Sequence, residues 1–123
     1  LYLTAVTDAG LKELAALENL QEIELAYTGV TDAGFKELAA IKSLTWISVA
    51  NQQKVTGVGL KELAKLKNLT TLVLYNTQVG DDQLKELAAF PSLATLSLGL
   101  TKITDAGLKE LTALKSLTTL SLN

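Results

Sequence analysis

Glu22 and Glu24 are the acidic residues whose spacing comes closest to that of a catalytic pair. On an extended strand, residues two apart point to the same face with Cα atoms about 6.6 Å apart, a separation compatible with the acid and the base of a glycosidase. Nothing in the surrounding sequence buries either carboxylate, and an open sheet surface excludes no water. We therefore expect no enzymatic activity.

A recurring threonine-aspartate pair could act as a row of cation ligands. A calcium ion needs six to eight converging oxygens, each recurrence supplies one or two, and Gly57 interrupts the row. The alternative is structural, because a threonine caps a helix start and an aspartate in the first turn favours the helix dipole. We predict this capping role, with no metal and no cofactor, for Thr7, Thr31, Thr56 and Thr104 and for Asp8, Asp32, Asp81 and Asp105.

Composition argues against several classes of function. The chain has 123 residues, 48% of them apolar, and a net charge of −2, so it carries no basic footprint for nucleic acid. It contains no His, no Cys and no Arg, which removes the commonest general base, thiolate chemistry and bidentate phosphate recognition. No apolar run approaches the roughly 18 residues of a membrane-spanning helix. We expect no nucleic-acid partner and no insertion into a membrane.

The candidate residues are positioned by a repeated unit. Aligned on one aliphatic position, the units begin 24, 25, 24 and 24 residues apart, at Val6, Val30, Val55, Val79 and Ile103. Each unit pairs a segment of the "LKEL" type, whose leucines and alanines recur at helical spacing, with a segment such as "LTTLVL", which ends in strict alternation. Each unit thus predicts a short helix and a short strand. Because one unit cannot bury its own apolar stripe, the units must stack.

"LTTLVLYNTQV" followed by "GDDQLKELAAF" resembles a leucine-rich repeat, and the "VTDAGLKEL" half is similar to the subtype common in bacterial proteins. The resemblance implies an α/β solenoid, a curved right-handed stack with its parallel sheet on the concave face. Residues 1–123 would form one domain of about five units, part of a longer chain and without terminal caps. A flavodoxin-like domain is the more distant alternative. One departure from the family pattern is threonine at the usual Asn or Cys position, where it would satisfy turn backbone groups: Thr4, Thr28, Thr77 and Thr101.

Residues that vary between units and face outward are the candidate binding residues. Alternation along the strands places some of them on the open sheet surface, and others follow directly after the strands. All the Trp and Tyr residues fall in these two groups, Tyr2 among them, and exposed aromatic side chains gathered on one surface are typical of a binding patch. The predicted partner-binding residues are Glu22, Glu24, Tyr27, Trp46, Ser48, Asn51, Thr71, Val73, Tyr75 and Asn76.

The unit that begins at Val30 is one residue longer than the others, which predicts an enlarged loop, Asn51 to Lys54, beside Trp46. The resemblance and the aromatic patch together favour a non-catalytic module that binds a protein or a peptide on the concave face. Carbohydrate binding on the same face remains open, since Trp and Tyr rings also stack on sugars. A structural role, as a spacer or as a segment that associates with itself through the C-terminal edge strand, is the other alternative.

Overall fold

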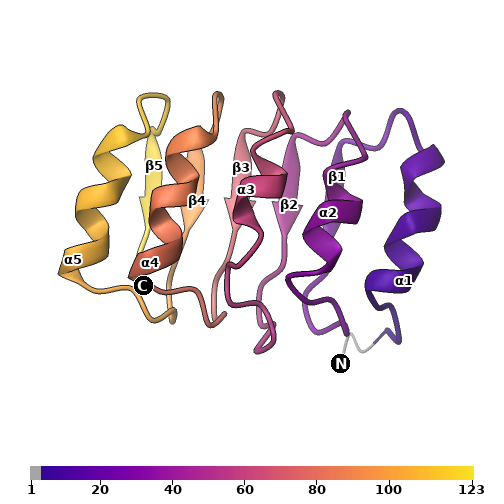
Figure 1. Ribbon diagram of the computed structural model, residues 1–123, viewed down its shortest axis with the longest axis horizontal. Helices are drawn as coiled ribbons and strands as arrows, with labels where there is room; N and C mark the ends of the chain where they lie inside the picture. The colour runs from indigo at the N-terminus through magenta and orange to yellow at the C-terminus, as the bar shows by residue number, and fades with distance from the viewer. Residues whose placement is uncertain (1–3) are drawn as a thin grey trace.

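The computed structural model describes residues 4–123, so Tyr2 lies outside the described residues. These residues form two layers, a single sheet and a row of helices along one of its faces (Figure 1). Neighbouring strands are parallel and follow chain order: β1 (Glu22–Glu24), β2 (Trp46–Ser48), β3 (Thr71–Val73), β4 (Thr95–Ser97) and β5 (Thr119–Ser121).

The helices are short because a unit of about 24 residues must also supply a strand and two connections. The first, fourth and fifth units continue an α-helix into a 3-10 helix, whereas the other two contain an α-helix alone. Within residues 4–123, no helix is both long and apolar enough to span a membrane. The helices are α1 (Asp8–Leu11) with η1 (Lys12–Ala16), α2 (Gly34–Leu38), α3 (Leu60–Leu63), α4 (Asp81–Leu84) with η2 (Lys85–Ala89), and α5 (Asp105–Leu108) with η3 (Lys109–Ala113).

The strand order separates a solenoid from a doubly wound fold. A flavodoxin-like domain reverses its strand order at a switch point and carries helices on both faces of the sheet. Here the order runs from β1 to β5 without reversal, and the helices cover one face (Figure 1). Because strands pack about 4.8 Å apart and helices 8–10 Å apart, the sheet occupies the inner, concave side. The predicted α/β solenoid is confirmed.

The core lies between the two layers and repeats from unit to unit. The central residues of the strands pair in register, from Ile23 through Ile47 and Leu72 to Leu96. Phe35 and Phe90 stand where sister units carry Leu or Ile, and both are buried, as the alignment predicted. Among the described residues, every buried side-chain nitrogen or oxygen has a hydrogen-bond partner. The stack therefore buries a continuous apolar interior without leaving polar side-chain atoms unsatisfied.

Two leucines at the same place in different units test the coupling between units. Leu72 is fully buried in β3, whereas Leu120 of β5 keeps 40% of its surface exposed. Leu72→Ala leaves a cavity between two packed units and should lower the free energy of unfolding by about 2–5 kcal/mol. Leu120→Ala should cost clearly less, because fewer neighbours surround the removed atoms. Denaturant unfolding of both variants measures the difference, and equal losses would contradict the stacked arrangement.

Candidate functional site

The open face of the sheet begins with a row formed by the first residues of the strands. Trp46 pairs in register with Glu22 on one side and Thr71 on the other. Glu22 is exposed, while Trp46 and Thr71 are half-buried. The indole is therefore less open to solvent than its place in the alternation suggested. It still presents part of a large apolar surface beside an acidic side chain.

The second row of the open face contains Glu24, Ser48 and Val73, which also pair in register. Glu24 is exposed and Val73 is half-buried, but Ser48 keeps only 2% of its surface. The expectation that the Ser48 side chain lies open on the sheet is wrong. Its hydroxyl oxygen accepts a hydrogen bond from the backbone N–H of Ala50 at 3.5 Å.

The rim at the carboxyl ends of the strands carries Tyr27, Asn51, Asn76 and Leu100, one from each of four successive units. Tyr27 is 51% exposed, and the two asparagines are half-buried. Trp46 is the first residue of β2, whereas Asn51 lies in the turn three residues after the last one, Ser48. The enlarged loop therefore follows the carboxyl end of the strand that Trp46 opens, and the predicted contact between them stays a prediction. The predicted residues divide into an open-face group and a rim group.

Tyr75 lies between these two groups. It follows β3 and is half-buried. A Cβ atom placed on Gly99 of the next unit would overlap the backbone of Asn123 and would also lie 3.0 Å from Tyr75 Cδ2. The glycine at this place thus makes room first for the Asn123 backbone and then for the tyrosine ring.

The recurring aspartates contact the following unit. Asp8 accepts hydrogen bonds from Thr31, from the backbone N–H at 2.8 Å and from Oγ1 at 2.7 Å. Asp81 accepts the same pair from Thr104, at 2.8 and 2.7 Å. Asp32 accepts from Thr56 N–H and Oγ1 and also from the N–H of Gly57. We call each of these contacts an aspartate–threonine clamp.

The capping role predicted for these residues is correct only in part. Thr104 caps α5 and accepts from the N–H of Ala106 at 3.3 Å, and Thr31 accepts from the N–H of Ala33 at 3.2 Å. Thr7 precedes α1 without a side-chain capping bond, and the residue that precedes α3 is Gly59 rather than Thr56. Asp8, Asp81 and Asp105 do begin helices, while Asp32 lies before α2. The main role of the pair is to join units.

Between the third and fourth units both halves of the clamp are missing. Gly57 stands at the aspartate position and Gly80 at the threonine position. In the fourth unit Gln83 replaces the glycine of the sister helices, and its Oε1 accepts from the N–H of Gly80 at 3.2 Å. A Cβ atom on Gly57 would lie 3.0 Å from Gln83 Cβ, so the glutamine side chain occupies the space that an aspartate would need. The residues at positions 57, 80 and 83 therefore depend on one another, and we call these three differences the coordinated substitution.

Comparison with known proteins agrees with this architecture. A family model described as a leucine-rich repeat matches residues 91–111. The structure of internalin C2 from Listeria monocytogenes is similar, with 30% sequence identity and a TM-score of 0.68 over 91% of this chain. A leucine-rich repeat protein of Leptospira interrogans is similar over 87% of this chain, with 26% identity and a TM-score of 0.67. These matches support the predicted resemblance to leucine-rich repeat proteins.

The likeness covers only part of each relative. This chain spans 46% of the internalin and 26% of the Leptospira protein. A search of curated proteins finds no match. Leucine-rich repeat folds are commonly used for protein interaction, and their proteins are generally non-catalytic.

The position that usually holds Asn or Cys in a leucine-rich repeat has the predicted role here. Thr28, Thr77 and Thr101 each donate a side-chain hydrogen bond to the carbonyl oxygen three residues earlier, at 2.8, 2.7 and 2.6 Å. The unit that begins at Val30 lacks this threonine, and its replacement was not predicted from the sequence. Gln52, placed in a loop by its sequence, is buried, and its Nε2 donates to Thr28 Oγ1 and to the carbonyl oxygen of Leu25. The absence of the threonine was the signal that another donor was needed.

Two glycines of the repeat allow the helices to approach, as predicted. A Cβ atom on Gly34 would lie 2.5 Å from Asp8 Oδ1, and one on Gly107 would lie within 3.0 Å of both Asp81 and Leu84. The missing side chain therefore leaves space for the clamp carboxylate of the preceding unit. Within the described part of the chain, no three acidic side chains gather in a way that could hold a metal ion.

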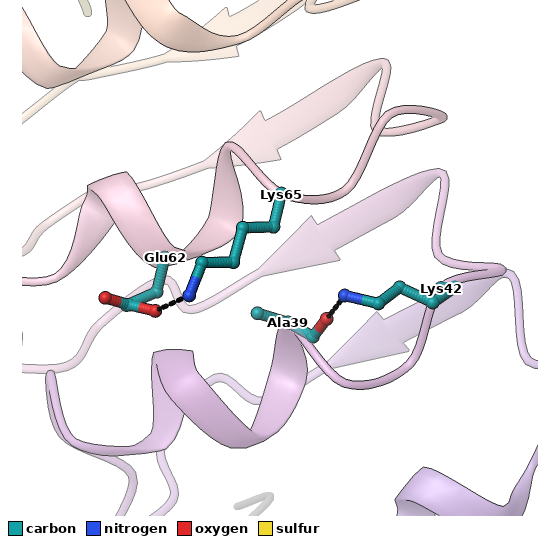
Figure 2. Close-up of polar contacts among 4 residues, drawn as sticks. All are labelled: Ala39, Lys42, Glu62 and Lys65. Carbon is teal, nitrogen blue, oxygen red and sulfur yellow. Dashed lines mark hydrogen bonds and ion pairs between the residues drawn. The ribbon is translucent and has the colours of Figure 1, made fainter.

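Short-range polar contacts lie at the carboxyl ends of α2 and α3 (Figure 2). Lys42 Nζ donates to the carbonyl oxygen of Ala39, directly after α2, where a positive charge complements the helix dipole. Lys65 pairs with Glu62 of α3 at 2.5 Å, and its hydrogen bond and charge hold the pKa of Glu62 below the usual value. Both lysine side chains are exposed, and Glu62 is half-buried.

The clamp at Asp81 should make stability depend on acid pH. Hydrogen bonds from the Thr104 N–H and then from its hydroxyl lower the pKa of Asp81 below its usual 3.8. A depressed pKa in the folded state adds stability that is complete above the unfolded value and is lost as the pH falls through the folded value. Asp81→Asn should therefore lose less stability than the parent chain between about pH 6 and about pH 2. Asp82→Asn, which removes the same charge one residue along, is the control, and identical pH dependence for Asp81→Asn and the parent would contradict the clamp.

Proposed function

We propose that this chain is a non-catalytic binding module that recognises a protein or a peptide through the concave, open face of its sheet. The observation that carries the proposal is the row Glu22, Trp46 and Thr71, paired in register on the face that no helix covers. Large aromatic side chains that remain accessible on a rigid surface supply much of the energy of protein recognition.

Charge on this face supports a preference for basic partners. Glu22 and Glu24 are both exposed at one end of the sheet, and both point to its open side. Acidic side chains placed this way attract a lysine, an arginine or another amine-bearing group and speed its encounter with the face. The apolar surface of Trp46 lies next to Glu22 along the register, and Val73 lies one strand farther, beyond Ser48. The partner that best complements this face therefore carries a basic side chain next to an apolar side chain.

Catalysis has less support. Glu22 and Glu24 lie on one three-residue strand, both exposed, and Glu24 Oε1 accepts a hydrogen bond from the backbone N–H of Ala26 at 2.9 Å. That bond ties one carboxylate to its own chain, and a shallow sheet does not shield the pair from water. Both carboxylates stay exposed to water, whereas an acid and a base in catalysis need surroundings, such as burial, that set the two groups apart.

Replacing Trp46 by Ser tests the proposal. The substitution should weaken binding of a protein or peptide partner by about 2 kcal/mol or more, the size expected of an interface hot spot. Because the ring is only half-buried, it should lower the melting temperature less than Leu72→Ala does. Binding would be measured by titration of a peptide selected on an array, with a glycan array in parallel.

Lys36→Ala on the convex side is the matched control and should leave both affinity and stability unchanged, because its side chain is exposed on α2. A large loss of stability with unchanged binding in Trp46→Ser would assign the ring to the core and end the proposal. If the chain bound glycans selectively and bound no peptide, the partner would be a carbohydrate and the proposal of a protein or peptide partner would be wrong.

A further inference from the structure

The turn that leaves each strand forces one residue into the left-handed backbone region. The φ angles are 57° at Tyr27, 59° at Asn51, 53° at Asn76 and 53° at Leu100. Asparagine enters this region readily, whereas a tyrosine or a leucine meets steric strain between its Cβ atom and the backbone. Two of the four turns therefore carry a residue that the local geometry disfavours.

Packing within the chain does not offset this strain. Tyr27 keeps 51% of its surface exposed and Leu100 keeps 63%. A strained residue normally persists because its side chain or its surroundings compensate for it, and such residues gather where ligands bind. Here most of each side chain faces outward, and a shallow hollow beside Tyr27 is lined by Thr4, Glu24, Ala26 and Thr28. Contact between these two side chains and another molecule would offset the strain of their backbone conformation.

The residues between these two side chains form an ordered row of amides. Gln78 Nε2 donates to Gln53 Oε1 at 2.5 Å, Gln53 Nε2 donates to Asn76 Oδ1 at 3.2 Å, and Asn76 Nδ2 donates to Asn51 Oδ1 at 2.9 Å. Within residues 4–123, the Asn51 side-chain nitrogen donates no hydrogen bond and Gln78 Oε1 accepts none. The row therefore keeps a donor at one end and an acceptor at the other, as a peptide group does.

We propose that this rim binds an extended peptide segment of a protein partner, with Tyr27 and Leu100 contacting two apolar side chains and the amide row contacting the peptide backbone between them. Tyr27 and Leu100 are three strands apart, so about 14 Å separates their turns. An extended peptide covers about 14 Å in four residues, and residues four apart point to the same side. The preferred peptide thus carries apolar residues at positions i and i+4.

The proposal rests on the proposed function for the class of partner, but it uses a different surface. A sugar is the less fitting ligand, because a leucine offers no flat aromatic face for stacking at its end of the row. Trp46 lies at the opposite ends of the strands from the rim. Variants on the two surfaces can therefore separate the two proposals.

Selection from a displayed library of random peptides, with the 123-residue chain as bait, tests the spacing. Enriched peptides should share two apolar residues separated by three positions, and moving the second one to i+2 should weaken binding at least tenfold. An enriched set without this spacing, or binding restricted to oligosaccharides on a glycan array, would overturn the proposal.

Tyr27→Asn and Leu100→Asn test the residues, because this chain already carries asparagine at the same place in two other units. Each variant should raise the melting temperature by relieving strain and should bind the selected peptides at least tenfold more weakly, while Tyr27→Phe should retain affinity. Lower stability of both asparagine variants, or unchanged affinity, would overturn the proposal. Loss of affinity in Trp46→Ser alone would support the open face and reject the rim, and loss in the two asparagine variants alone would do the reverse.

Discussion

The aspartate–threonine clamp joins the helix sides of successive units at three of the four boundaries between units. A unit of 24 or 25 residues cannot bury its own apolar stripe, so it is stable only when the next unit lies against it in one fixed position. The carboxylates of Asp8, Asp32 and Asp81 fix that position on the helix side, by accepting from both the backbone and the hydroxyl group of a threonine in the following unit. On the sheet side the parallel ladder fixes it again, from Glu22 against Trp46 through to Ser97 against Ser121. Gly34 and Gly107 are required because a side chain there would occupy the space of the carboxylate.

A fixed register turns a repeated sequence into a surface that can vary. Equivalent positions in successive units lie about one strand spacing apart, so a residue is free to change wherever it supports neither the core nor the clamp. On the open face this freedom places Trp46 between Glu22 and Thr71. At the rim it places Tyr27 and Leu100 in turns whose geometry suits asparagine better. The residues that repeat thus make the scaffold, and those that differ make the contact surfaces. This division explains why the motifs that recur most often in the chain carry no chemistry of their own.

Periodicity predicts what depends on backbone geometry, and it fails where side-chain length decides the outcome. The repeat predicted the stacked units and the outward alternation of Glu22, because the spacing of residues along the chain determines both. It missed the burial of Ser48, whose hydroxyl oxygen accepts from the backbone N–H of Ala50. It placed Gln52 in a loop, although a side chain of that length reaches back to Thr28 in the preceding unit. The clamp was not predicted, because helix capping already explained why an aspartate follows each threonine. In addition, the two residues of a clamp lie 23 or 24 residues apart in sequence. Trp46 lies at the start of its strand, whereas the rim residues follow the strand ends. A list of outward-facing residues does not record at which end of a strand each residue lies, so it did not predict this separation.

The coordinated substitution at the boundary of the third and fourth units allows the most direct test of the clamp. Gly57→Asp, Gly80→Thr and Gln83→Gly together rebuild the pattern of the other boundaries, whereas Gly57→Asp alone places a side chain against Gln83 and Gln83→Gly alone removes the acceptor for the N–H of Gly80. The free energy of unfolding of the parent, the single variants and the triple variant would be measured in denaturant. If the clamp sets the register, the triple variant should be more stable than the sum of the single effects by about 1–3 kcal/mol, the size of coupling between residues in contact. Additivity within about 0.5 kcal/mol would contradict the account, because it would mean that the three positions act independently.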